Sequence, residues 1–300
     1  MRNNLWPALP LEEWKETYAT LHMWTQVVGK IRLAQTPLIN HWWNVSLYVT
    51  ARGLTTSAMS YKDRTFQIDF DFIDHQLLIK CDDGAGDTIA LAPCSVADFY
   101  REVMRVLRGL GLAVKIWPVP VEVQDPIPFE EDHKNASYDA EYANRFWRVL
   151  VQVDNVFTEF RSRFIGKCSP VQFFWGSFDL AVTRFSGRRA PERVGADRVT
   201  REGYSHEVIS GGFWPGSGNI QDAAFYAYAA PEPFEYNTSH ILPPAAFYNP
   251  PTKGFILMYD DVRKADNPDR MVLDFLQSTY EAGAELGKWD RRSLEREVKP

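Results

Sequence analysis

Hydrophobic residues recur every three or four positions in four segments of this 300-residue chain. In the first segment, Trp14, Leu21 and Val28 fall on one side of a helix. Ser95 and Asn267 stand directly before two of the segments and suit the N-cap position, where a side-chain oxygen accepts a hydrogen bond from a free backbone N–H. The pattern predicts long helices over residues 11–34, 96–110, 139–164 and 268–286.

Between the predicted helices the hydrophobic period falls to two, as in a strand with one buried face. Residues 65–73 alternate Phe and Ile with Gln67, Asp69 and Asp71. Residues 42–52 and 174–183 alternate in the same way, each with an apolar side and a side that mixes aromatic and polar residues. Further short strands are expected at 77–79, 89–91, 225–228, 245–248 and 255–259.

The two halves of the chain resemble each other when the sequence is shifted by 133 residues. Trp14 then falls on Trp147 and Trp42 on Trp175, and residues 14–50 share seven identities with residues 147–183. Average composition gives roughly two or three. We therefore expect an internal duplication.

The duplication predicts an α+β fold. Each pseudo-repeat would consist of a helix, four strands and a helix, and the two would form one antiparallel sheet with helices on one face. This order is similar to the saddle-shaped topology of the TATA-binding protein, an analogy of fold alone. The expected divisions are a first repeat at 1–118, a proline-rich linker at 119–137 and a second repeat at 138–300.

Composition narrows the class of protein. A hydrophobic fraction of 45% and a charged fraction of 24% are typical of a soluble globular chain. The formal net charge of −6 argues against nucleic acid as a partner. The N-terminus has no signal-peptide pattern and no segment is apolar enough to cross a membrane, and three cysteines leave a thiol unpaired, so we expect a cytoplasmic protein.

The sheet face opposite the predicted helices is the main candidate for function. It mixes Trp and Tyr with Asn, Ser and Asp, which is typical of a ligand cavity, although a protein interface or a solvated face uses similar residues. We prefer a cleft for a small molecule, with an organic anion as the expected ligand class; a homodimer or partner interface on the same face is the alternative. The expected ligand-binding residues are Trp42, Asn44, Ser46, Tyr48, Arg52, Asp69, Asp71, Trp175, Ser177, Thr183, Arg184 and Trp214.

Residues 186–219 lack clear periodicity over more than thirty positions, and loops of that length are usually functional or disordered. The segment contains five arginines together with His206 and Glu207. One interpretation is a lid that supplies cations and an acid–base pair to a ligand bound on the sheet, with His206 as the general acid or base. A solvated charged loop is the other.

Three carboxylates have competing interpretations. Asp69 and Asp71 project from one side of one strand and suit either a metal or a division of acid and base roles, but carboxylates on a solvated strand are the commoner case. Asp179 is a speculative catalytic residue, and its charge would need a partner such as Arg52 or Arg184 if it is buried. The histidines show no metal-ligand spacing, so no metal site is predicted; the cofactor and any reaction stay open.

Several longer strings carry a resemblance that covers nearly the whole chain. They lie at residues 5–10, 40–45, 70–75, 174–181 and 204–210. With them the chain resembles a family of bacterial proteins of about this length that is catalogued as domain of unknown function 5996. The resemblance implies a soluble bacterial protein and implies no activity, cofactor or catalytic residue.

Overall fold

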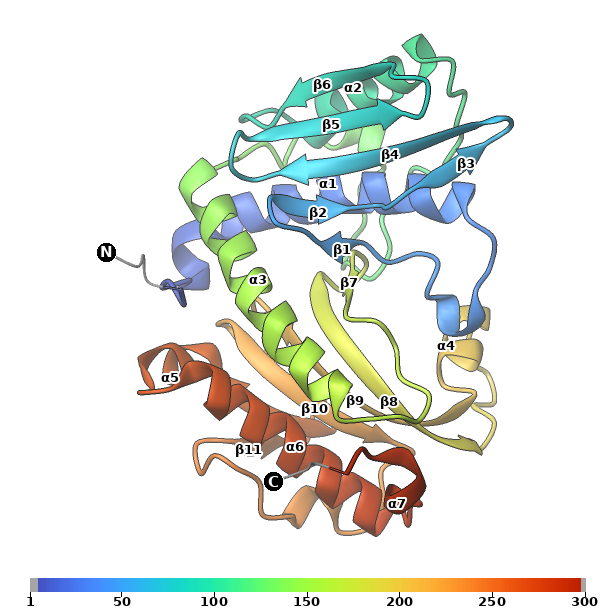
Figure 1. Ribbon diagram of the computed structural model, residues 1–300. Helices are drawn as coiled ribbons and strands as arrows, with labels where there is room; N and C mark the ends of the chain where they lie inside the picture. Colours follow the sequence, from blue (N-terminus) through green and yellow to red (C-terminus); the bar gives the residue numbers. More distant parts are fainter. Residues whose placement is uncertain (1–4, 298–300) are drawn as a thin grey trace.

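The computed structural model describes residues 5–297 of the chain (Figure 1). All four predicted long helices are present within about two residues of their expected ends. Ser95 and Asn267 cap two of them by accepting hydrogen bonds from the backbone N–H groups of Asp98 and Arg270. The helices are α1 (Leu11–Gln35), α2 (Val96–Gly109), α3 (Ala140–Ser162), α4 (Arg198–Gly203), α5 (Tyr259–Lys264), α6 (Pro268–Leu286) and α7 (Arg291–Leu294), with 3-10 turns η1 (Asn40–Trp42), η2 (Phe129–Glu131) and η3 (Tyr236–Thr238).

The strands form two antiparallel sheets of six strands each, one from each half of the chain. The first sheet has the order β1-β2-β4-β5-β6, with β3 beside β4. Its strands are β1 (Tyr48–Val49), β2 (Gly53–Thr55), β3 (Met59–Tyr61), β4 (Arg64–Asp71), β5 (Gln76–Cys81) and β6 (Gly86–Ala90).

The second sheet has the order β11-β12-β10-β9-β8-β7. Its strands are β7 (Gln172–Phe174), β8 (Asp179–Arg189), β9 (His206–Trp214), β10 (Ala224–Ala230), β11 (Phe247–Asn249) and β12 (Gly254–Met258). The predicted α+β class is therefore confirmed, but the expectation of one shared antiparallel sheet is wrong: each half forms a sheet of its own, with six strands rather than four.

The edges of the two sheets meet at a single bridge. Leu47 and Phe173 exchange two backbone hydrogen bonds of 2.9 Å each, directly before β1 and within β7. Because paired residues point to the same side, the buried Leu47 side chain lies on the same face as Phe173, which packs on Phe146 of α3. The hydrophobic core therefore continues from one sheet to the other, and its largest cluster includes residues of both halves.

Helices α3 and α6 lie in front of the second sheet in Figure 1. Gly211 of β9 faces them, since a Cβ at this position would lie 2.4 Å from Leu276 of α6. Its cross-strand partner Val182 shares this face, so the neighbouring residues Thr183 and Ser210 lie on the other. We call this other side of strands β7–β10 the open face.

Three sequence expectations are wrong in detail. Residues 174–183 do not form one strand, because residues 175–178 make the turn between β7 and β8, with a left-handed backbone at Phe178 (φ of 59°). Residues 42–52 do not form one strand. His41 and Trp42 both have left-handed backbones, with φ of 60° and 62°, and belong to the 3-10 turn η1. Residues 186–219 are not an irregular loop: β8 continues to Arg189, Asp197 caps α4, and β9 crosses the sheet. The glycines of β9 hid the strand pattern, although Gly211 is required there by the close approach of α6.

No helix within residues 5–297 is long and apolar enough to cross a membrane.

Candidate functional site

Polar side chains run across the middle of the open face. Thr183, Ser210 and Tyr228 are paired in register on β8, β9 and β10. The Thr183 and Ser210 hydroxyl oxygens are 2.9 Å apart, and the Tyr228 hydroxyl is 2.9 Å from that of Tyr204, which follows α4. The segment around α4 therefore contacts this face through Tyr204, and it contains a short helix capped by Asp197.

Asp179 lies at one end of the open face and is 7% exposed. Its carboxylate accepts hydrogen bonds from the hydroxyls of Ser177 and Tyr226. The Tyr226 ring reaches it across Gly212, where an added Cβ would lie 2.3 Å from the ring. Burial raises the pKa of Asp179, and the two hydroxyl hydrogen bonds oppose this rise. Asp179 is thus a buried acid held by hydroxyl groups.

Glu122 brings a second carboxyl group to this end of the face. The Gln26 side chain of α1 clamps the preceding residue, Val121: it donates to the carbonyl at 2.8 Å and accepts from the N–H at 2.9 Å. A Glu122 oxygen fills the space beside Gly176, 2.4 Å from where a Cβ would be. Glu122 is open to solvent on one side, but crowding by protein atoms raises its pKa, and the charge of Asp179 adds to the effect.

Three nitrogen-bearing side chains meet near the opposite end of the open face; we call His41, Lys167 and His206 the Lys167 site. The His41 Nδ1–H donates to the carbonyls of Glu202 and Gly203 at 3.0 and 3.2 Å, at the end of α4. The other ring nitrogen of His41 is therefore an acceptor, and Lys167 Nζ donates to it at 2.6 Å. The His206 ring stands edge-on to His41, with ring centroids 5.6 Å apart.

Aromatic rings line the Lys167 site. Lys167 Nζ lies 4.9 Å from the centre of the Phe185 ring and 5.6 Å from that of Trp43. Phe185 belongs to a small cluster against which Trp43, Tyr204 and Tyr228 also pack. Within residues 5–297, no carboxylate lies within ion-pair distance of Lys167.

The surroundings disfavour the charged form of each group of the Lys167 site. Burial lowers the pKa of Lys167. Burial, and then the Lys167 charge, lowers the pKa of both His41 and His206; Arg189, the cross-strand partner of His206, lowers the latter further. The site is a positively charged, partly desolvated corner without a negative group in the described chain.

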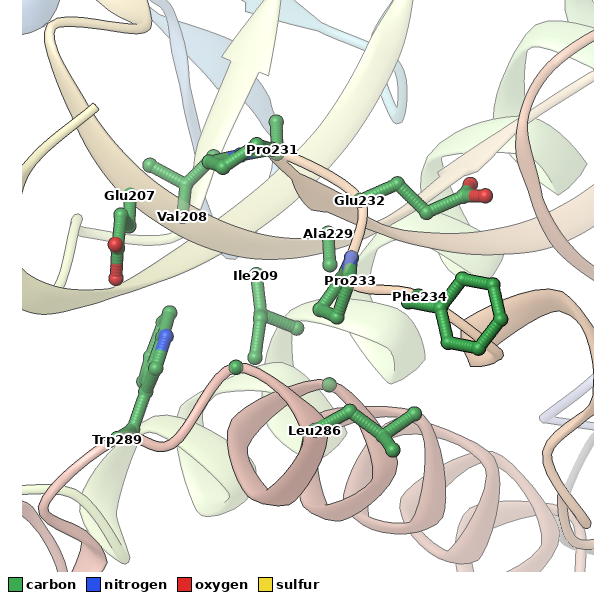
Figure 2. Close-up of a pocket in the computed structure, with 13 residues that line it drawn as sticks. Glu207, Val208, Ile209, Ala229, Pro231, Glu232, Pro233, Phe234, Leu286 and Trp289 are labelled. Carbon is green, nitrogen blue, oxygen red and sulfur yellow. The ribbon is translucent and has the colours of Figure 1, made fainter. Parts of the chain in front are cut away.

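His206 and Glu207 do not form the expected acid–base pair. Adjacent strand residues point to opposite faces, and the Glu207 carboxylate is held by Arg188 at 2.7 Å on the helix side. There it borders a cavity of about 220 Å³ together with Leu286 and Trp289, as Figure 2 shows.

A second cavity, of about 350 Å³, is lined by Tyr204 and Tyr228, which also pack against the cluster around Phe185, but not by His41, Lys167 or His206. Neither cavity is lined by Trp42, Tyr48, Trp175 or Asp179, around which the sequence placed the cleft.

Three further residues that were expected to bind a ligand, Trp175, Ser46 and Tyr48, have partners within the protein. The Trp175 ring lies on α1 at Gly29, which has no room for a Cβ, and its Nε1 donates to the Val45 carbonyl at 2.7 Å. Gln172 Nε2 donates hydrogen bonds to the Ser46 hydroxyl at 2.7 Å and to the Tyr48 hydroxyl at 3.4 Å.

Trp42 lies under Arg198, whose guanidinium carbon is 5.4 Å from the ring centre. The Asn44 side chain accepts from the Ile39 N–H at 3.3 Å and donates to Thr36 at 3.3 Å, which fixes the turn after α1. At the far end of β9, Trp214 packs on Tyr226, with ring centroids 5.4 Å apart.

Arg52, Asp69 and Asp71 lie in the first sheet, away from Asp179. Arg52 forms ion pairs with Asp71 at 2.5 Å and Asp74 at 2.6 Å, so it does not neutralise Asp179. Asp69 accepts from the Thr55 hydroxyl at 2.6 Å and pairs with Lys80 at 3.3 Å. The two carboxylates thus have separate partners.

Arg184 is buried on the helix side. Its guanidinium donates to the Phe160 carbonyl and lies 3.4 Å from the centre of the Phe160 ring and 4.3 Å from that of Tyr280. It belongs to the core rather than to the open face. Among residues 5–297, no group of three or more His, Cys, Asp or Glu side chains could hold a metal ion.

The model of a family of unknown function (DUF5996) matches residues 6–296, nearly the whole chain. The chain belongs to this family. No curated protein and no solved structure matches it.

The sequence patterns did not predict two residues that border the open face in this family member, Lys167 and Glu122. Lys167 follows α3 without a motif around it, and it meets His41 across 126 positions of sequence. Glu122 lies in a segment that its prolines marked only as a linker. The repeat of polar and aromatic positions did locate Asp179, Thr183 and the strand neighbours that form the open face.

Proposed function

We propose that this protein binds a small organic anion at the Lys167 site. The observation that carries the proposal is the position of Lys167: a half-buried ammonium group whose Nζ has His41 at 2.6 Å and no carboxylate partner within the described residues. Charged groups that leave water are normally paired, because their desolvation is otherwise costly. A bound anion would supply that partner.

The electrostatics of the site support the same ligand class. Burial lowers the pKa of all three groups, and the Lys167 charge lowers the pKa of His41 and His206 further, so an anion placed among them would favour the protonated histidines. Binding would then take up protons, and affinity would fall as the pH rises.

Aromatic walls support an organic ligand rather than a bare ion. Trp43 and Phe185 flank the Lys167 ammonium, and Tyr204 and Tyr228 continue the wall into the cavity of about 350 Å³. Ligand sites commonly combine such apolar area with a few placed polar groups.

Backbone strain also marks this place. His41 and Trp42 are consecutive non-glycine residues with left-handed backbones. Such conformations cost on the order of 1–3 kcal/mol each and persist where the surroundings hold them, often at functional sites. Here the two α4 carbonyls and Lys167 hold the His41 ring.

Calorimetric titration with inorganic phosphate and with benzoate tests the proposal. The charge-removing variant is Lys167→Met, and the matched control is Lys62→Met, since Lys62 is exposed and also lies over an aromatic ring, 5.3 Å from the centre of Tyr61. Loss of a charge-assisted hydrogen bond of about 1.5–3 kcal/mol corresponds to a roughly 10- to 150-fold weaker affinity for Lys167→Met. Equal affinities for the two variants, or no binding of either anion to the native chain, would refute the site.

We further propose that the two halves arose by duplication and form a saddle-like assembly. The 133-residue shift places Tyr48–Val49 of β1 on Ala181–Val182 of β8, and most of α3 on α1, which supports the idea. By the same shift, β7 falls on residues 39–41, which include most of η1. Superposition of residues 14–50 on 147–183 in an experimental structure tests it: a common helix-plus-strand arrangement supports duplication, and its absence refutes it.

The interface alternative stays a prediction. A monomer by light scattering at micromolar concentration would remove the homodimer version.

A further inference from the structure

The hydrogen bond between Lys167 and His41 has the geometry of an amine beside its base. Lys167 Nζ is 2.6 Å from His41 Nε2, and the hydrogen bonds of the opposite ring nitrogen to the Glu202 and Gly203 carbonyls keep the Nε2 lone pair free of a proton. A lysine that attacks a carbonyl carbon needs a free lone pair and a neighbouring group that takes its proton.

The surroundings of Lys167 favour the neutral amine. The titratable groups that face it are His41 from η1 and His206 from β9, with Arg189 of β8 beyond His206; none carries negative charge. The rings of Trp43 and Phe185 flank the Lys167 Nζ, 5.6 and 4.9 Å away. The pKa of Lys167 is lowered by burial, in agreement with this arrangement.

From this geometry we infer that Lys167 forms an imine with an aldehyde or ketone group carried by the bound anion. This inference rests on the proposed function, because the anionic part of the ligand would be held by His206 and Arg189 while its carbonyl carbon meets Nζ. The ligand class is thereby narrowed to small oxo acids and other carbonyl compounds with a negative group.

The reaction is a balanced condensation. The Nζ lone pair forms a bond to the carbonyl carbon as the C=O π bond breaks, and one Nζ proton passes by way of His41 Nε2 to the carbonyl oxygen, giving a carbinolamine. A second proton leaves Nζ for His41 Nε2 and is passed to the hydroxyl group, which departs as water. One amine and one carbonyl group give one imine and one water, with no change of oxidation state.

Trapping with glyoxylate and sodium cyanoborohydride tests the inference. Glyoxylate is an aldehyde with a carboxylate, and hydride from the added reductant converts its imine into a stable carboxymethyl group on the lysine. Peptide mapping should find Lys167 modified at least tenfold faster than Lys62 in the same sample. The preference should persist as the pH is lowered, because surface lysines are then protonated.

Three controls separate the roles of the anionic group, His41 and His206. Acetaldehyde lacks the anionic group and should show a much smaller preference for Lys167. His41→Gln removes the proton acceptor and should slow modification of Lys167 while leaving that of Lys62 unchanged; His206→Gln, with the base retained, should weaken glyoxylate binding more than it slows the trapped reaction at saturation.

The outcomes distinguish this inference from the proposed function. If benzoate binds to the native chain in a Lys167-dependent manner but Lys167 is trapped no faster than Lys62, the imine is refuted and the anion site stands. If neither binding nor preferential trapping is found, both are refuted.

Discussion

The His22 side chain should make the protein sensitive to acid. His22 is buried in α1, and its Nε2–H donates to the Gly176 carbonyl at 2.8 Å in the turn that presents Ser177 and Asp179. Burial lowers its pKa from 6.5 to about 4, and the backbone hydrogen bonds oppose the shift only in part. The neutral ring therefore links α1 to one end of the open face.

The sign and size of the effect follow from the difference in pKa. Above pH 6.5 the ring is neutral in the folded and the unfolded chain, so no penalty arises. As the pH falls from 6.5 to about 4, only the unfolded chain takes up the proton, and the free energy of unfolding falls. At about 1.4 kcal/mol per unit, the loss amounts to about 3 kcal/mol by pH 4.

Urea unfolding at about pH 7 and pH 4 measures this loss. His22→Gln retains a side-chain donor but cannot be protonated, so its free energy of unfolding should fall by about 3 kcal/mol less than that of the native chain over this interval. His240→Gln, at an exposed histidine, is the matched control and should behave like the native chain. Equal acid losses in all three proteins would show that His22 is not the buried neutral group described here.

Two further changes test the packing around the site. Gly29→Ala places a Cβ 2.2 Å from the Trp175 ring and should destabilise the fold by about 1–3 kcal/mol. Gly109→Ala, at the end of α2 with open space around it, should be neutral or stabilising by up to about 1 kcal/mol. Thermal unfolding compares the two variants, and equal effects would contradict the packing of Trp175 on Gly29. Asp179→Asn should change the free energy of unfolding by less than about 1 kcal/mol at neutral pH, because burial already disfavours the charge. Asp179→Ala should cost about 2–4 kcal/mol, because it leaves the Ser177 and Tyr226 hydroxyls without their acceptor. Similar values for both variants would contradict the role of Asp179 as a buried acceptor.

The sequence was most informative where local pattern decides structure. The four long helices follow from three- and four-residue spacing, and β4 follows from the alternation of Phe66, Ile68 and Phe70 with polar residues. The same alternation placed Asp179 and Thr183 on one side of β8. These features depend on neighbours in the chain and on burial of one face.

Features set by long-range contacts were not accessible in this way. The left-handed backbones of His41 and Trp42 interrupt a segment whose alternation suggested a continuous strand, and the contacts that hold them come from α4 and Lys167. Trp175 has the composition of a ligand contact but instead packs on Gly29. An aromatic residue beside polar ones has the same pattern in a cavity and in a helix–strand junction, so only the packing distinguishes them.

The position of a bound anion tests the central claim most directly. A crystal soaked with 4-bromobenzoate would locate the ligand from the anomalous signal of bromine. We expect the carboxylate within hydrogen-bond distance of Lys167 Nζ, between His41 and His206, with the ring against Phe185 or Tyr204. A carboxylate bound elsewhere, with Lys167 still in contact with His41 alone, would contradict the account.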